Sequence, residues 1–423
     1  MPMQRRSFLT LAAASGAGAT FLGLAPQARA LSTLQVDVSR PVRPVSQVGS
    51  GTLYGLALPD RPPVDLLLPL KLNTLRQPPP NHDHFPNGET EHVGDVLDIA
   101  GNAIEAGADI TVDMADTFSG FPYNWAGWDD WLGRVDRMIA DLRARPDITN
   151  VTAWEIWNEP DWTWSGSAGS FNDGWARTYQ RLRAGDATTP IMGPSYSYWN
   201  ADMMRGFLTA AQASGTVPEV ISWHELRGWQ GVDSNIRAYR ALEQELGIGP
   251  LPISINEYAA TDEIDVPSTV NHYIAQFERE GVRDAERAFW FEAGTLNGLL
   301  HNNQPTASYW MYQWYAEQTG DIVSVTPTQY NDAVAAYDAD QRVVSVVFAG
   351  EAGDNTIQVT GLNDFGSAVT GTLEYTPGSG RTTVVNAPTR ISTQTYPVSN
   401  GTASVLVNDE DHLGAYRLVL TPA

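Results

Sequence analysis

Two glutamates stand where apolar runs of the sequence stop, and together they could carry out acid–base chemistry. Glu159 sits in an Asn-Glu-Pro triplet after the aromatic run 154–157, and Glu257 ends the apolar run 253–256. Proline lacks an N–H and disfavours the helical region for the residue before it, so we expect Glu159 to be extended or in a turn where a strand ends. Taken alone, the triplet fits a general acid/base and a cap of the following helix equally well.

The two carboxyl groups as a pair suit glycoside hydrolysis. That reaction needs one acid to protonate the leaving oxygen and one carboxylate to attack or assist at the anomeric carbon. Carboxyl groups that face each other raise the pKa of one member, so the pair is costly unless it serves a purpose. The structural alternative is two unrelated strand-end acids that neighbouring arginines or tryptophans satisfy.

The elements that must position this pair follow a repeating pattern. From about residue 47 the chain alternates short apolar runs with amphipathic stretches, as parallel strands covered by helices do. We expect strands at 51–56, 72–76, 109–113, 151–157, 191–195, 220–224, 253–257 and 287–291. We expect helices at 128–143, 175–183, 203–213, 234–246, 270–280 and 308–317. This order predicts a (β/α)8 TIM barrel with its active site at the carboxyl ends of the strands. A doubly wound open sheet is the alternative, but no Gly-rich phosphate loop follows any strand.

The composition changes after the last barrel helix. The region 321–423 is rich in Val, Thr and Gly, with period-two runs at 343–348, 356–359, 371–375 and 416–420. This pattern predicts a C-terminal antiparallel β-sandwich domain. The alternating residues 34–38 should pair with it. We therefore divide the chain into an export signal (1–30), an N-terminal strand that joins the sandwich (31–46), a catalytic barrel (47–318) and a β-sandwich accessory domain (319–423).

The N-terminus has the features of a twin-arginine export signal. Arg5 and Arg6 precede a small and apolar run, 10–24, and a small-residue cleavage site, 28–30. We expect a secreted, extracytoplasmic protein that is exported already folded; an uncleaved anchor is the alternative. No later stretch approaches about 20 uninterrupted apolar residues, so we expect no membrane association after cleavage.

Composition narrows the chemistry further. The chain has no cysteine, which removes disulfides, thiolate nucleophiles and cysteine metal sites. Its formal net charge of -23 becomes about -26 once Arg5, Arg6 and Arg29 leave with the signal. Such a surface repels nucleic acid and anionic membranes. The 14 Trp and 16 Tyr suit stacking on sugar faces as well as packing in a core.

The two motifs together resemble clan A of the retaining glycoside hydrolases, a large (β/α)8 group. Asn158-Glu159-Pro160 after a fourth strand and Glu257 at the end of a seventh carry the resemblance. It implies that Glu159 is the acid/base, that Glu257 is the nucleophile and that Asn158 hydrogen-bonds the sugar 2-hydroxyl. A barrel followed by a sandwich that an N-terminal strand joins is most similar to glycoside hydrolase family 39, with family 51 as second choice.

Two further strand-end residues match the clan pattern. Arg76, at the end of the second strand, resembles the arginine that contacts the nucleophile; a surface salt bridge is the alternative. His224, at the end of the sixth, matches a position where many clan members place a His or Tyr near the nucleophile or substrate; a structural histidine is the alternative.

Four more residues are candidates for substrate contact. Trp290 or Phe291 on the eighth strand could form the floor of a sugar subsite, or belong to the core. Asp113 could bind a sugar hydroxyl or cap a helix. Trp162, with the tryptophans of 154–157, could exclude water and so keep Glu159 protonated at rest.

We expect a double displacement with carboxyl groups about 5 to 5.5 Å apart. This chemistry needs no cofactor, and the seven histidines form no HExxH pair, so we expect no metal. The one histidine cluster, at 82–84, should line the cleft. No Gly-x-Ser-x-Gly elbow supports a serine hydrolase. The serious rival is a non-catalytic carbohydrate-binding barrel. Xylose, arabinofuranose, galactose and glucose all remain open as the sugar, as do exo and endo action.

Overall fold

The computed structural model describes residues 32–82, 84–85 and 93–423. The predicted signal, 1–30, lies outside the described residues, as does Asp83.

Eight parallel strands close into a barrel, which confirms the predicted fold class. They are β2 (Gly51–Leu53), β3 (Thr74–Gln77), β4 (Asp109–Asp113), β5 (Val151–Glu155), β6 (Ile191–Tyr196), β7 (Val220–Glu225), β8 (Ile253–Tyr258) and β9 (Asp284–Arg287). The barrel closes where Gly51 of β2 pairs with Glu286 of β9. An added Cβ at Gly51 would lie 2.7 Å from the carbonyl oxygen of Ala285, so the close approach of these strands requires glycine there.

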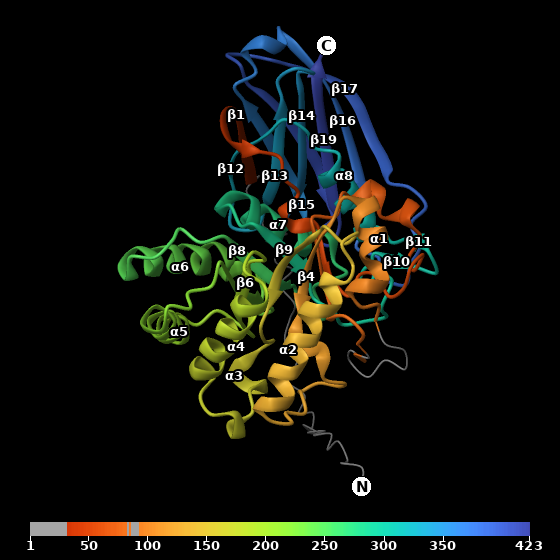
Figure 1. The fold of residues 1–423 in the computed structure, drawn as a ribbon. Coiled ribbons are helices and arrows are strands. Elements are labelled where there is room, and N and C mark those ends of the chain that lie inside the picture. Colours follow the sequence, from red (N-terminus) through yellow and green to blue (C-terminus); the bar gives the residue numbers. More distant parts are fainter. Residues whose placement is uncertain (1–31, 83, 86–92) are drawn as a thin grey trace, which may run out of the picture. The chain divides into compact units, whose positions relative to one another are not determined.

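Helices cover the outside of the barrel, as α2, α4, α5 and α6 do in Figure 1. They are α1 (Val96–Ala106), α2 (Trp128–Arg143), α3 (Pro160–Thr163), α4 (Phe171–Gly185), α5 (Ala201–Ser214), α6 (Val232–Leu246), α7 (Pro267–Glu280) and α8 (Ala307–Ala316). Short 3-10 helices lie at Val48–Ser50, Val64–Leu66, Leu68–Leu70, Met114–Thr117, Gly166–Ala168, Trp229–Gly231 and Asn363–Phe365. A two-strand hairpin, β10 (Leu300–His301) and β11 (Gln304–Pro305), precedes α8.

The helix α2 illustrates why these segments fold as they do. Its buried residues, Trp131, Val135, Met138 and Ile139, recur at helical spacing and form one face toward the barrel. The opposite face carries its charged residues. This regular amphipathic pattern is why the bounds predicted for α2 agree with the structure.

The prediction for the eighth strand was wrong. The strand is β9, Asp284–Arg287, and not 287–291. Its residues Asp284, Glu286 and Arg287 have ionisable side chains yet are buried, a pattern that sequence reading assigns to a loop. The apolar residues after it, Phe289 and Trp290 among them, form a loop beyond the strand, so Trp290 is not a strand residue.

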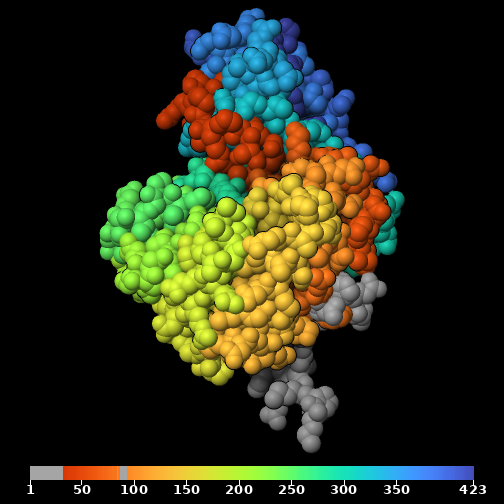
Figure 2. All heavy atoms as spheres, viewed as in Figure 1, coloured from red at the N-terminus to blue at the C-terminus, as the bar shows by residue number. Residues whose placement is uncertain are grey.

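The C-terminal region forms a mostly antiparallel sheet that includes the N-terminal strand. The strand order is β17-β16-β19-β14-β13-β12-β1-β15-β18, and β1 is antiparallel to β12 and parallel to β15. The strands are β1 (Ser32–Pro44), β12 (Asp321–Thr326), β13 (Asp332–Asp338), β14 (Val343–Ala349), β15 (Gly353–Thr360), β16 (Ala368–Thr376), β17 (Thr389–Pro397), β18 (Ala403–Glu410) and β19 (Ala415–Pro422). Figure 2 shows the red residues of β1 beside the cyan and blue residues of these strands.

This sheet encloses its own core. Leu373 of β16, near one end of the sheet, and Val405 of β18, at the other, belong to the same buried cluster. The sheet therefore packs against itself as a sandwich does. It also contacts the barrel through α7, where Arg279 forms an ion pair with Asp332 of β13 at 2.6 Å. None of the helices in the described ranges has the length and apolar character that crossing a bilayer would require.

Candidate active site

Glu159 lies just beyond β5, at the turn into α3. Its backbone is left-handed, with φ 53° and ψ 51°, and not extended. Its N–H donates to the carbonyl oxygen of Ser195 at 2.9 Å, which holds the turn. The side chain makes no capping bond to α3. One carboxyl oxygen accepts a hydrogen bond from Trp162 Nε1 at 2.8 Å, and the other lies 3.1 Å from His224 Nδ1.

Glu257 lies in β8 and faces the same point. Its Oε1 accepts a hydrogen bond from Arg76 Nη1 at 2.7 Å, and its Oε2 lies 3.7 Å from His224 Nδ1. One carboxyl oxygen of Glu159, one of Glu257 and a ring nitrogen of His224 all lie within 4.8 Å of one another. The two predicted acids and the predicted histidine therefore meet at one place.

Arg76, at 0% exposure, is bound by acidic and amide oxygens. Besides Glu257, its guanidinium donates to both oxygens of Glu155 at 2.6 and 2.7 Å, to Asp113 at 2.8 Å and to Asn158 Oδ1 at 3.0 Å. A planar guanidinium with five N–H donors suits such a cluster. Arg76 thus orients the nucleophile candidate from behind and holds Asn158 in place.

Asp113 serves the scaffold in this structure. One oxygen binds Arg76, and the other accepts from the N–H of Ala115, which caps the short helix Met114–Thr117. The side chain is fully buried and is not among the residues that line the pocket. Of the two roles considered for Asp113, the cap is the one that the structure displays.

A pocket opens over the two glutamates. It is lined by Leu53, Tyr54, His84, Phe121, Tyr123, Asn158, Glu159, Glu257, Phe289 and Trp290. The structure therefore brings Asn158 and Trp290 to the pocket, together with both glutamates. Trp290 is held there because its Nε1 donates to the carbonyl oxygen of Ala259, in the loop after β8, at 3.1 Å.

Sequence reasoning missed a polar cluster in the pocket wall. Tyr54 and Tyr123 donate to the two oxygens of buried Asp116, at 2.5 and 3.2 Å, and His84 Nδ1 lies 3.4 Å from one of them. Asp116 lies in the 3-10 helix Met114–Thr117, Tyr54 directly follows β2, and Tyr123 and His84 lie in loops. No apolar run that ends in a carboxylate marks this cluster, and His84 was expected to line the cleft. Burial, with the charge of Asp116 second, raises the pKa of Tyr54 well above its ordinary value.

The electrostatics of the two glutamates differ. Burial raises the pKa of Glu159, but the hydrogen bond and charge of His224, followed by Trp162, outweigh burial and bring the pKa below its ordinary value. Burial also raises the pKa of Glu257, and there it exceeds the lowering by His224 and Arg76, so the pKa lies above its ordinary value. Burial lowers the pKa of His224, but both carboxylates reverse this and raise it.

His224 Nδ1 and the Trp162 N–H both lie within hydrogen-bond distance of Glu159, and a donor to a carboxylate favours its charged form. These two groups therefore oppose the expected effect of the surrounding tryptophans, which was to raise the pKa of Glu159 and keep it protonated.

Within the described residues, one group of three side chains could converge on a metal ion: Glu159, His224 and Glu257. The guanidinium of Arg76, 2.7 Å from Glu257, places a fixed positive charge beside that point and opposes a cation there.

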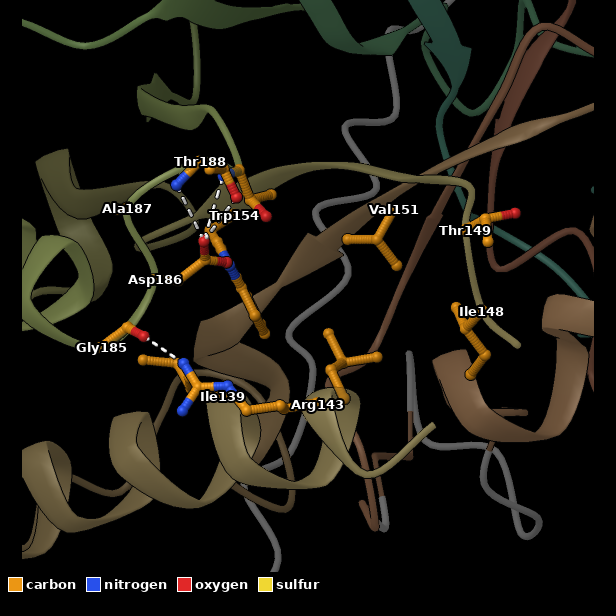
Figure 3. A pocket seen from close by; sticks show the side chains of 12 residues that line it. Ile139, Arg143, Ile148, Thr149, Val151, Trp154, Gly185, Asp186, Ala187 and Thr188 are labelled. Atoms are coloured by element: carbon orange, nitrogen blue, oxygen red, sulfur yellow. Dashed lines mark hydrogen bonds between the residues drawn. The ribbon is translucent and has the colours of Figure 1, made fainter. Parts of the chain in front are cut away.

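A larger cavity, of about 460 Å³, lies elsewhere (Figure 3). It is formed by the end of α2, the amino-terminal end of β5 and the loop after α4. Asp186 there accepts from Trp154 Nε1 at 3.0 Å and from the N–H groups of Thr188 and Thr189, while Arg143 donates to the carbonyl oxygen of Gly185. These contacts are structural, and the cavity does not adjoin the carboxyl ends of the strands.

Comparisons with known proteins agree with this geometry. No family model matches the chain. The structure of the GH39 enzyme from Xanthomonas axonopodis pv. citri has the same fold, with a TM-score of 0.67 at 15% identity over 95% of this chain and 100% of that one. The structure of N2152 from Neocallimastix frontalis has a TM-score of 0.88 at 35% identity, over 93% of this chain and 100% of that one.

Two curated relatives are glycosidases. The 3-O-α-D-galactosyl-α-L-arabinofuranosidase of Bifidobacterium longum subsp. longum is 27% identical over 80% of this chain and 30% of its own length. The 3-O-β-L-arabinopyranosyl-α-L-arabinofuranosidase of Bifidobacterium pseudocatenulatum is 25% identical over 93% of this chain and 48% of its own length. The chain thus spans a third to a half of the length of the curated relatives it matches.

The chain has the fold of the GH39 enzyme, and the resemblance of its two motifs to clan A of the glycoside hydrolases, family 39 in particular, is consistent with the solved structures and with the two curated glycosidases. At 35% identity over the whole of N2152, the chain belongs to the same family as that protein.

Proposed function

We propose that this protein is a retaining glycoside hydrolase that acts on α-L-arabinofuranosides, with Glu257 as nucleophile and Glu159 as acid/base. The observation that carries the proposal is the convergence of Glu159, His224 and Glu257 within 4.8 Å in a pocket, with Arg76 bound to Glu257. Retaining enzymes hold their carboxyl groups about 5 to 5.5 Å apart, whereas inverting enzymes leave room for a water. Oxygens within 4.8 Å of one another support retention.

In the first step, Glu257 attacks the anomeric carbon and the bond from that carbon to the leaving oxygen breaks. The leaving oxygen takes the proton that the hydrogen-bonded pair Glu159–His224 holds. Because the two groups share one hydrogen bond, a proton on His224 is one transfer away from Glu159. The lowered pKa of Glu159 reflects this sharing in the unliganded site.

In the second step, ionised Glu159 takes a proton from water as that water attacks the anomeric carbon. The bond to Glu257 breaks, and Glu257 is released as a carboxylate beside Arg76. The donors that lower the pKa of Glu159 favour its action as a base in this step. Asn158, held by Arg76 at the pocket, is placed to bind the sugar 2-hydroxyl.

The sugar is suggested by the relatives. Both curated proteins are α-L-arabinofuranosidases whose names specify a substituent at O3 of the arabinose. We therefore propose 3-O-glycosylated and plain α-L-arabinofuranosides as substrates before β-xylosides, β-galactosides or β-glucans. Among the residues that the structure describes, the pocket lining carries no lysine or arginine, and Glu159 and Glu257 are its only carboxylates, which supports a neutral sugar.

Azide separates the two proposed roles. Glu257→Ala with azide should yield a glycosyl azide of inverted configuration, because azide then attacks the substrate directly. Glu159→Ala with azide should yield the retained configuration, because azide then intercepts the glycosyl-enzyme. Glu105→Ala, at an exposed position on α1, is the control and should match the wild type. Reversed azide products would exchange the roles, and sugar binding without turnover on a broad glycoside panel would favour a carbohydrate-binding barrel.

We also propose that the chain is exported through the twin-arginine signal at 1–30. Secretion of the wild type, and cytoplasmic retention when Arg5 and Arg6 are both replaced by Lys, would support this. Equal secretion of both forms would contradict it.

A further inference from the structure

Two large aromatic side chains stand exposed at the rim of the pocket. Trp162 is 54% exposed and Phe121 is 41% exposed. They come from different segments, Trp162 from α3 and Phe121 from the loop after β4, and their rings meet edge to face with centroids 5.0 Å apart. Leaving this much aromatic surface in water has a cost that core packing would have avoided.

The pair is fixed in position from below. Phe121 contacts Tyr123 edge to face at 5.5 Å, and Tyr123 in turn donates to buried Asp116. Trp162 is fixed by its hydrogen bond to Glu159. Both rings are therefore presented as rigid surfaces, which keeps the entropic cost of binding a ligand small.

The position of the pair identifies what it could bind. An acid/base must reach the glycosidic oxygen, so the leaving group lies on its side of the anomeric carbon, and the nucleophile lies on the opposite side. Trp162 touches Glu159 at 2.8 Å, whereas the Glu257 side is occupied by Arg76. The exposed rings therefore stand where the departing sugar must be.

We propose that Trp162 and Phe121 form the subsite for the leaving group, where the Trp162 ring stacks on a neutral sugar and the Phe121 ring, perpendicular to it, lies against the edge of that sugar. This inference rests on the proposed function and on Glu159 as the acid/base. It means that the enzyme selects substrates by the sugar that departs as well as by the sugar that forms the glycosyl-enzyme. Trp162 then has two separable actions, since its ring stacks on the sugar and its N–H bonds Glu159.

The test compares two substrates with the same glycone and different leaving groups. One carries a sugar as leaving group, and the other is the glycosyl azide, whose leaving group has no ring. Phe121→Ala should lower kcat/KM at least tenfold for the first and less than twofold for the second. Tyr330→Ala, which removes an exposed aromatic in the C-terminal region, is the control and should change neither.

Trp162→Phe separates stacking from the hydrogen bond. It keeps a ring and removes the N–H, so kcat/KM for the sugar leaving group should fall less than in Trp162→Ala, which removes both. The basic limb of the pH profile should move to higher pH, because the Trp162 bond lowers the pKa of Glu159.

Three outcomes would overturn the subsite. They are equal losses of kcat/KM on both substrates in Phe121→Ala, no loss on either, and a loss on the sugar leaving group that is as large in Trp162→Phe as in Trp162→Ala. If the wild type hydrolyses neither substrate, the proposed function fails and the subsite falls with it.

Discussion

Buried acids lie at two levels of the barrel interior, and they differ in whether a cation binds them. At the carboxyl ends of the strands, Glu155, Asp113 and Glu257 all share the guanidinium of Arg76 at 2.6 to 2.8 Å. Lower in the barrel, Glu286 has no such partner. Gly51 pairs with Glu286, and the next residue of β2 pairs with Leu75, so Glu286 lies two strand positions below Arg76.

Among the residues that the structure describes, neither carboxyl oxygen of Glu286 has a hydrogen-bond partner. Burial, with the charge of Asp284 second, raises the pKa of Glu286 well above its ordinary value. A buried carboxyl group without a partner avoids the cost of its charge by keeping its proton. The difference teaches that the acids at the carboxyl ends of the strands share one guanidinium as hydrogen-bond donor, whereas Glu286 is accommodated without a cationic partner, and its raised pKa favours the neutral form.

Removing Arg76 should destabilise the cluster of acids at the carboxyl ends of the strands. Arg76→Ala leaves three carboxylates in one buried space, and the loss of one partner from a buried ion pair typically costs about 3 to 5 kcal/mol. Urea unfolding at pH 7 should show a loss of that order in the free energy of unfolding, together with loss of turnover. Arg145→Ala is the matched control, since it breaks only the exposed pair with Asp147 and should change little. Equal stability of both variants would contradict a structural role for the Arg76 cluster.

Removing the acid of Glu286 should have a smaller effect with a defined pH dependence. Because its folded pKa is raised, the contribution of Glu286 to stability is fully present below its unfolded pKa and is lost as pH rises through the folded pKa. Glu286→Gln cannot ionise, so its free energy of unfolding should fall less than that of the wild type as pH rises. An unsatisfied buried polar group costs about 1 to 3 kcal/mol, so the two free energies of unfolding should differ by an amount of that order. Parallel stability curves for the two proteins would contradict a neutral Glu286.

The same contrast explains what could be predicted from the sequence. Glu159, Glu257, Arg76 and His224 were found because each follows an apolar strand, and strand ends converge at a barrel mouth. The structure places these four side chains together, although their catalytic roles stay predictions. The strand β9 was misplaced because Asp284 and Glu286 look like loop residues when burial is unknown.

The pocket wall could not be predicted for a different reason. Asp116 lies in a short 3-10 helix, Tyr54 directly follows β2 and Tyr123 lies in a loop, and nothing local in the sequence shows that their side chains meet. The C-terminal sheet was predicted as a class from period-two alternation, but alternation cannot specify which strands pair. The limits proposed for the domains likewise stay a prediction.

Replacing His224 tests the acids at the carboxyl ends of the strands separately from Glu286, because it changes the charge only at those strand ends. The positive charge of His224 lowers the pKa of both glutamates, so His224→Gln should raise both. The acid limb of the profile of kcat/KM against pH follows ionisation of Glu257, and the basic limb follows loss of the proton that Glu159 delivers. The acid limb should therefore move to higher pH, by about one unit for a neighbouring charge of this kind. His412→Gln, at an exposed position, should leave the profile unchanged; an unmoved profile in His224→Gln would contradict the electrostatic coupling.

Glu225 is intermediate between the acids bonded to Arg76 and Glu286, because it is a buried acid whose hydrogen-bond donors are neutral. The change expected there, in a single resonance, is the smallest of those predicted. Trp223 Nε1 donates to it at 2.7 Å, and Asn235 Nδ2 donates at 3.0 Å, while burial raises its pKa to about 7. The neutral donors Trp223 and Asn235 lower the pKa of Glu225, but burial outweighs them. The indole N–H resonance of Trp223, identified by its loss in Trp223→Phe, should titrate with a midpoint near pH 7 in the wild type and not in Glu225→Gln. If the Trp223 resonance is unchanged between pH 5 and 9, Glu225 does not titrate in that range. Burial would then influence the pKa values of acids in this barrel more than hydrogen-bond donors do, whether those donors are charged or neutral.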